Sequence, residues 1–241
     1  MSLLPKNDAP IYSVVLPVSK QEIKFRPYFV KEQKLLLMAK EAGDRKTIID
    51  TISQIVSNCV LSKIDTTQLP LTDVEFIFYN LRARSESETI HLKYKCENII
   101  EDGSICGNTL HHKFNILTDI EVTEPLHPII KISDFIAIKM KHQLFEYSEF
   151  DEKQNPTPDE LLYELSKQIE FISSGDEVIT TTDISKQEII DWLGDLTVTQ
   201  YAKLEEFVMN EPKIHKRIQI TCKKCGMVHD IDVEDLYDFF M

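Results

Sequence analysis

The sequence is poor in glycine, with only six in 241 residues. It contains no glycine-rich phosphate loop and no Gly-x-Ser-x-Gly elbow, which excludes the common nucleotide-binding and hydrolase signatures. Six glycines and ten prolines are also too few for collagen-like or low-complexity chains. No apolar run approaches the roughly 20 residues of a membrane-spanning helix, so we expect no membrane partner.

Positive charge is scarce as well. The chain has 27 Lys and Arg against 40 Asp and Glu, a net charge of −13. A phosphate-binding surface would need a local basic patch against this background, so nucleic acid is not expected as the main partner. The first eight residues lack the charged-then-apolar plan of a signal peptide. We therefore expect cytosolic synthesis, where thiols stay reduced and five cysteines indicate metal binding or catalysis before disulfides.

The pattern of apolar residues predicts an α+β fold. In residues 1–87 it predicts a small strand-and-helix unit, because two alternating runs are followed by segments of helical spacing. The expected strands are 11–16 and 22–25, and the expected helices are 30–40, 48–59 and one that starts at a capping box of Thr72 and Glu75 and ends near Arg84.

Two cysteine-bearing hairpins are predicted far apart in the chain, within residues 88–118 and 213–241. Apolar residues alternate on both sides of each cysteine pair, as in antiparallel strands. We expect an apolar helical turn with Leu236, Phe239 and Phe240 to close the chain.

Residues 119–212, between the hairpins, are predicted to form a mainly helical insertion. Its expected elements are a strand at 136–141, a polar loop at 148–159, an amphipathic helix from Leu161 to Ile172, and two helices that begin at the capping boxes of Ser185 and Thr197.

The strongest chemical signal is the set Cys96, Cys106, Cys222 and Cys225. A structural zinc site takes four ligands in a tetrahedron, and each hairpin tip can supply two thiolates. A glycine follows the second cysteine of each pair, where the backbone must turn back toward the sulfurs. The nine-residue spacer between the first two cysteines exceeds the usual two to four, so that knuckle must hold a bulged loop. We predict a split zinc ribbon with one structural Zn²⁺.

Other interpretations of the cysteines remain open. The pairs could be reduced thiols without metal, or Cys222 and Cys225 a redox dithiol, although no βαβ setting accompanies them. A histidine on a neighbouring strand could replace one cysteine ligand; the candidates are His111, His112 and His229. Cys59 shares a helix face with isoleucines and is predicted to be a core thiol.

No catalytic residues are predicted. Four thiolates leave no open position on a metal, and the chain has no His-Glu-x-x-His motif. We therefore expect a protein that is not an enzyme.

Several segments carry a resemblance to a known family. The chain resembles the baseplate hub assembly proteins of T-even-like contractile-tailed phages over nearly its full length. The most specific segment is Arg26–Ala39, and the others are 12–16, 73–78, 81–85, 196–207 and 238–240.

This resemblance implies a non-enzymatic protein that binds other hub proteins while the tail baseplate is built. It implies a place in the host cytoplasm during assembly or in the tail baseplate of the virion. The family role leaves open whether a member stays in the particle or acts as an assembly chaperone, and the oligomeric state is equally open.

Two further expectations concern surfaces. The segment Arg26–Ala39 carries more apolar side chains than one helix face can bury, so either it presents a partner surface or all of them are internal core. The main alternative function is a zinc-ribbon nucleic-acid-binding or transcription accessory protein. Its support is a basic cluster near the second knuckle: Lys213, Lys216, Arg217, Lys223 and Lys224.

Overall fold

The computed structural model describes residues 8–146 and 155–233, and these form two compact units. The split unit comprises Met1–Thr123 and Lys213–Met241, and the inserted unit comprises Glu124–Pro212. Helices and antiparallel sheets occur in both, so the mixed helix-and-sheet class is as predicted. The finer division at residues 87 and 118 stays a prediction. The predicted turn at 236–240 lies outside the described residues.

The first part of the split unit follows the predicted order of strands and helices. A two-stranded sheet precedes three helices and one short 3-10 turn. The elements are β1 (Tyr12–Val15), β2 (Glu22–Phe25), α1 (Val30–Ala42), α2 (Arg45–Cys59), η1 (Thr66–Gln68) and α3 (Leu71–Ser85). Their apolar faces meet in a core where Phe25, Ile52 and Ile77 are almost completely buried.

The capping box predicted at Thr72 is wrong. Helix α3 begins one residue earlier, with Pro70 as its N-cap, and the Pro70 carbonyl accepts the amides of Asp73 and Val74. Proline is compatible with a helix start because the first amides of a helix have no intrahelical acceptor. Thr72 is buried inside the first turn instead.

A buried ion pair fixes the entry into α1. The Arg26 guanidinium donates to the Glu32 carboxylate at 3.0 Å, and that carboxylate also accepts the Phe29 amide at 2.6 Å. The Glu32 side chain is 2% exposed and the Arg26 side chain 15%. Burial alone would raise the pKa of Glu32, but the hydrogen bonds from Arg26 and the Phe29 amide and the charges of Arg26 and Lys31 outweigh it and lower the pKa.

Glu32→Gln is expected to lower the free energy of unfolding at pH 7 by about 2–3 kcal/mol, because it leaves the Arg26 charge buried without a counter-ion. A carboxylate whose pKa is lowered by folding stabilises the protein above its unfolded pKa. The difference between variant and wild type should therefore shrink as the pH falls below the ordinary Glu value of 4.5. Urea denaturation at pH 7 and at lower pH measures both effects.

The matched control is Glu41→Gln, since Glu41 is an exposed residue of the same helix. Its expected change lies within about 0.5 kcal/mol. Equal effects of the two substitutions would contradict the role of the buried pair.

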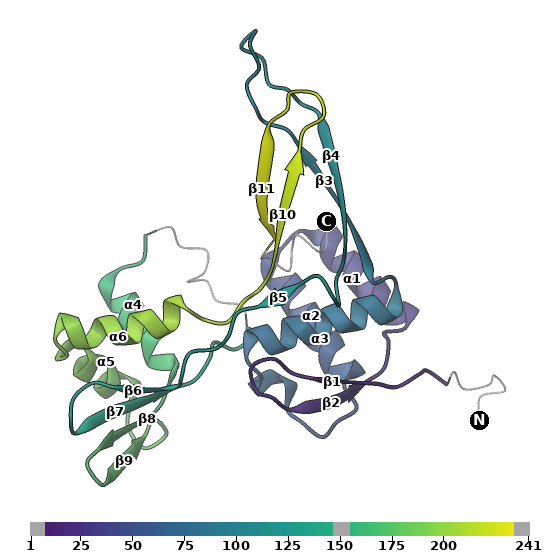
Figure 1. Ribbon diagram of the computed structural model, residues 1–241. Coiled ribbons are helices and arrows are strands. Elements are labelled where there is room, and N and C mark those ends of the chain that lie inside the picture. Colours follow the sequence, from purple (N-terminus) through teal and green to yellow (C-terminus); the bar gives the residue numbers. More distant parts are fainter. Residues whose placement is uncertain (1–7, 147–154, 234–241) are drawn as a thin grey trace. The chain divides into compact units, whose positions relative to one another are not determined.

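Two long hairpins complete the split unit (Figure 1). Strand β3 (Thr89–Lys95) pairs with β4 (Thr109–Asn115), and β10 (Ile214–Thr221) pairs with β11 (Val228–Val233). The short strand β5 (Glu121–Val122) adds to the other edge of β10. Each pair is antiparallel, as the alternation predicted, and each carries its cysteines at the turn end.

The inserted unit is a four-stranded antiparallel sheet with helices on one face (Figure 1). The strands, in spatial order, are β6 (Ile129–Lys131), β7 (Ile136–Met140), β8 (Ile169–Ser174) and β9 (Glu177–Thr180). The helices are α4 (Pro158–Lys167), α5 (Lys186–Gly194) and α6 (Val198–Met209). Ser185 and Thr197 cap α5 and α6 as predicted, each accepting the backbone amide three residues on.

The prediction of one helix through Ile172 is wrong. Helix α4 ends at Lys167, and Ile169 and Ile172 belong to β8, where they lie opposite Met140 and Ile138. The register shifts between Lys139 and Met140, and this bulge lets two residues three apart both enter the core. Their spacing therefore imitated a helix. The sequence predicted one strand in this mainly helical insertion, and the structure adds three more strands that form a sheet with it.

None of the helices in the described ranges is long and apolar enough to cross a bilayer.

Candidate metal centre

The four predicted cysteines lie together at the ends of the two hairpins. All their sulfur atoms are within 4.8 Å of one another. Across the hairpins, Cys96 Sγ is 3.6 Å from Cys225 Sγ, and Cys106 Sγ is 3.8 Å from Cys222 Sγ. A zinc tetrahedron with Zn–S bonds of about 2.3 Å has edges of about 3.8 Å. The donor set therefore fits a tetrahedral ion, while the separations are far too long for disulfides of about 2.05 Å.

The backbone of the second knuckle directs amides at the sulfurs. Gly226 has φ +76°, which returns the chain after Cys225, and Gly107 has φ +63° after Cys106. The Cys225 amide is the largest cause that lowers the pKa of Cys222, to about 6, and the Lys224 amide and Asn108 side chain add to it. The Met227 amide lowers the pKa of Cys225 in the same way. These donors favour thiolates, the form that binds metal.

The first knuckle is more enclosed. Burial raises the pKa of Cys96 to about 12, against a smaller opposing effect of the Asn98 amide. Cys96, Cys106 and Cys222 are buried with Leu110 in a small cluster at the hairpin ends. Because burial disfavours an uncompensated thiolate, Cys96 needs a positive partner to ionise, and a cation between the sulfurs would supply it.

The nine-residue spacer forms the bulged loop that its length predicted. Ile99 and Ile105 bridge each other, and Gly103 and Ser104 close a tight turn between them. The Cys106 amide donates to the Asn98 carbonyl at 2.8 Å. The extra residues thus form a small hairpin of their own, and the two cysteines remain close enough to share a site.

Three polar side chains lie around the sulfurs; the sequence had named His229 as a candidate ligand, whereas it did not predict the contacts of Asn108 and Lys224. Asn108 Nδ2 lies 3.4 Å from Cys222 Sγ, and Lys224 Nζ donates to the Cys106 carbonyl at 2.7 Å, so each joins one hairpin to the other. His229 Nε2 lies 3.1 Å from Cys96 Sγ. The sequence signal for Asn108 and Lys224 was their position within two residues of a cysteine.

The remaining residues that the sequence offered as possible metal ligands or functional thiols do not belong to the four-cysteine cluster. Among the described residues, the one group that could hold a metal contains the four cysteines and no histidine. His111 is exposed on β4, and His112 is half-buried beside it. Cys59 is fully buried in α2, where burial raises the pKa of its thiol to about 11, as suits a core residue.

Two members of the basic cluster near the second knuckle lie beside groups of opposite polarity. Arg217 lies opposite Asp232 in the hairpin register, and Lys224 is bound to the Cys106 carbonyl.

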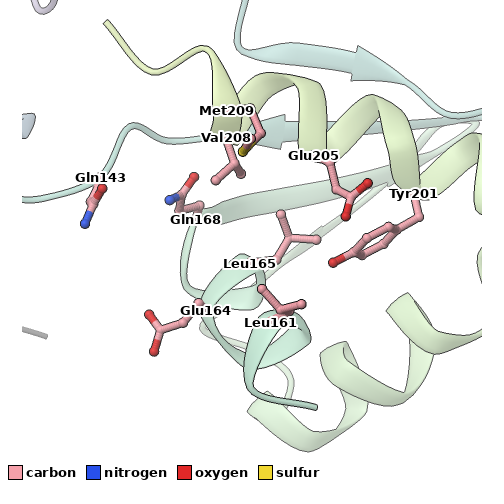
Figure 2. Close-up of a pocket in the computed structure, with 9 residues that line it drawn as sticks. All are labelled: Gln143, Leu161, Glu164, Leu165, Gln168, Tyr201, Glu205, Val208 and Met209. Atoms are coloured by element: carbon pink, nitrogen blue, oxygen red, sulfur yellow. The ribbon is translucent and has the colours of Figure 1, made fainter. Parts of the chain in front are cut away.

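The inserted unit holds an apolar pocket of about 320 Å³ between α4 and α6 (Figure 2). Leu161, Leu165 and Val208 line it, with Tyr201 and Glu205 on its α6 side. Burial, followed by the Glu205 charge, raises the pKa of Tyr201, so this phenol stays protonated at neutral pH. The described lining residues include neither histidine nor cysteine.

Comparison with known families decides what kind of protein carries these features. A family model described as T4 bacteriophage base plate protein matches residues 9–241. The chain belongs to this family. The match runs through both cysteine hairpins and the inserted unit, and the resemblance to T4-like phage baseplate proteins seen in the sequence is confirmed. No curated protein and no solved structure matches the chain significantly.

Proposed function

We propose that this base plate protein is a non-enzymatic subunit or assembly factor of the central hub of a phage tail. The observation that carries the proposal is the family match over residues 9–241. In this role the protein binds other hub proteins in the host cytoplasm during tail assembly, and it either remains in the baseplate or leaves as a chaperone.

We also propose that Cys96, Cys106, Cys222 and Cys225 bind one structural Zn²⁺. The tetrahedral spacing of the sulfurs supports this assignment, and so do the amides aimed at Cys222 and Cys225. A site with four thiolates has no open position for water or substrate, so the ion would hold structure and perform no chemistry. It would join residues as far apart as Cys96 and Cys225, 129 positions along the chain.

The hydrogen-bonding partners of the sulfurs fit this role. His229 and Asn108 lie within reach of Cys96 and Cys222, where they can donate to thiolates and hold them in place. The zinc-bound hairpins would then form the split zinc ribbon expected from the sequence.

Helix α1 supplies a candidate surface for hub partners. Of the apolar residues in Arg26–Ala39, Tyr28, Leu36 and Ala39 are buried, whereas Leu37 is 57% and Met38 55% exposed. The segment therefore serves the core with one face and leaves large apolar side chains on another, as a protein-binding helix does.

Affinity purification of the tagged protein from infected cells tests both proposals when zinc is measured in the same sample. We expect hub proteins of the same phage to co-purify, with one zinc per chain. Recovery of RNA polymerase subunits in their place would favour the nucleic-acid alternative and contradict the hub role. A metal-free preparation that still binds hub proteins would contradict the zinc assignment alone.

A further inference from the structure

The outward face of the β3–β4 hairpin is basic, in contrast to the net charge of −13. The inward residues Ile90, Leu92 and Leu110 are buried, so the alternate residues point away from the core. Cross-strand pairs on that outer face join His91 to Lys113 and Lys93 to His111. Lys95 continues the row opposite Thr109.

We name this surface the ribbon face and define it by Lys93, Lys95, Lys113, His91 and His111, all of which are exposed. The remaining outward residues are Thr89, Thr109 and Asn115, so the ribbon face includes no carboxylate.

The three lysines of the ribbon face have no counter-ion in the part of the chain that the structure describes. Lys93 lies diagonally across from Lys113, a placement that separates Cβ atoms by about 7–8 Å, and Lys95 is two residues further along the same strand. The positive charges of these three lysines repel one another. Within the described residues, these three lysines therefore share one face without an ion pair that offsets their charge.

We propose that the ribbon face docks an acidic surface of another tail protein. This inference rests on the proposed function, since it names the chemistry of a partner that a hub protein would bind. Charge complementarity is the argument: clustered, uncompensated lysines attract carboxylates, steer the approach of an acidic partner and fix its register. The ladder of seven paired positions gives the face a length of about 20 Å, a scale suited to one strand or helix of a partner.

Nucleic acid fits this face less well. A polyanion longer than the hairpin would meet the acidic remainder of the chain, including Asp230 and Asp232 on the outward face of β11. The ribbon face also includes no Phe, Tyr or Trp side chain on which bases could stack, and its aromatic rings are the two imidazoles of His91 and His111. A compact acidic protein surface can bind within the length of the hairpin and needs no aromatic ring to stack on, so the observations favour such a partner.

The test compares Lys93→Gln/Lys95→Gln/Lys113→Gln with a control, Lys24→Gln/Lys63→Gln/Lys131→Gln, in the zinc-loaded full chain. Both sets replace exposed lysines and change the net charge equally. Each purified hub protein of the phage is measured by biolayer interferometry against both variants and wild type, at 50 and 500 mM NaCl.

We expect at least one hub protein to lose about tenfold or more in affinity with the ribbon-face variant at low salt, mainly through slower association. The control should stay within about twofold of wild type. High salt should weaken the binding of wild type to the hub protein and reduce the difference in affinity between wild type and the ribbon-face variant. The thermal midpoint of the ribbon-face variant should not fall, because the substitutions remove repulsion and no contact.

Three results would overturn the proposal. Equal affinities of wild type and the ribbon-face variant for every hub protein that binds would refute the ribbon face and leave the hub role standing. Absence of binding to every hub protein would refute both. Lysine-dependent binding of a 20-base-pair DNA duplex, or lysine-dependent self-association in sedimentation velocity, without such an effect on any hub protein, would assign the face to a different partner.

Discussion

Chelation of zinc is expected to disorder the two cysteine hairpins and to lower the thermal midpoint of the protein sharply. Structural zinc in peptides binds with about 10–16 kcal/mol, as much as or more than the whole stability of a typical domain, about 5–15 kcal/mol. Without the ion, β3–β4 and β10–β11 would be joined near their tips only by a small cluster with Leu110 and by contacts such as Asn108 to Cys222. Calorimetry with and without a strong chelator measures the shift.

Hydrogen exchange should locate the effect. Amides of β3, β4, β10 and β11 are expected to lose protection first, because the proposed ion would connect these strands directly. Amides of α2, whose core residues Ile52 and Ile55 are fully buried, should stay protected longer. A thermal midpoint that does not move on chelation would contradict a structural role for the metal.

Cys222→Ser should lose bound zinc and reproduce the effect of the chelator, because a hydroxyl is a poor replacement for a thiolate ligand. The matched control is Cys59→Ala, which removes the one cysteine outside the site. It should keep one zinc per chain and lose stability only through a small cavity, about 1 kcal/mol. Equal zinc contents in the two variants would rule out Cys222 as a ligand.

Asp73→Ala is expected to cost about 3–4 kcal/mol of unfolding free energy, the second largest effect. The Asp73 carboxylate is completely buried, and its two oxygens accept the amides of Val18 at 2.8 Å and Ser19 at 2.9 Å. Hydrogen bonds to a charged group are worth about 1.5–3 kcal/mol each, and alanine would leave both half-buried amides without that acceptor. Asp73 also stands in the first turn of α3, where negative charge is favourable.

Urea denaturation followed by circular dichroism measures this loss. Asp73→Asn keeps one carbonyl acceptor, so its free energy of unfolding should lie between those of Asp73→Ala and wild type. Asp50→Ala, at an exposed position of α2, is the control and should change stability by no more than about 0.5 kcal/mol. A loss below about 1 kcal/mol for Asp73→Ala would mean that the β1–β2 turn does not depend on this carboxylate.

Local patterns in the sequence predicted most of the elements correctly. Alternation marked both hairpins, and the capping boxes at Ser185 and Thr197 located the starts of α5 and α6. The two failures had different causes, one a distant strand and the other a neighbouring residue. Ile169 and Ile172 share a helical spacing, but the bulge opposite Met140 places both in a strand. Thr72 and Glu75 match a capping box, but Pro70 starts the helix.

For the candidate metal centre, too, the sequence predicted one part and the tertiary structure decided the other. The sequence by itself determined which cysteines belong together, because paired thiols between alternating strands and followed by glycine form a local pattern. Only the tertiary structure decided that Cys96 faces Cys225 and Cys106 faces Cys222, and that His229 lies beside a sulfur. It also decided that Asp73 holds a turn and that three lysines gather on one ribbon. Periodicity and capping depend on neighbours a few residues apart, whereas these contacts join segments far apart in the chain or depend on strand register, which only the folded chain fixes.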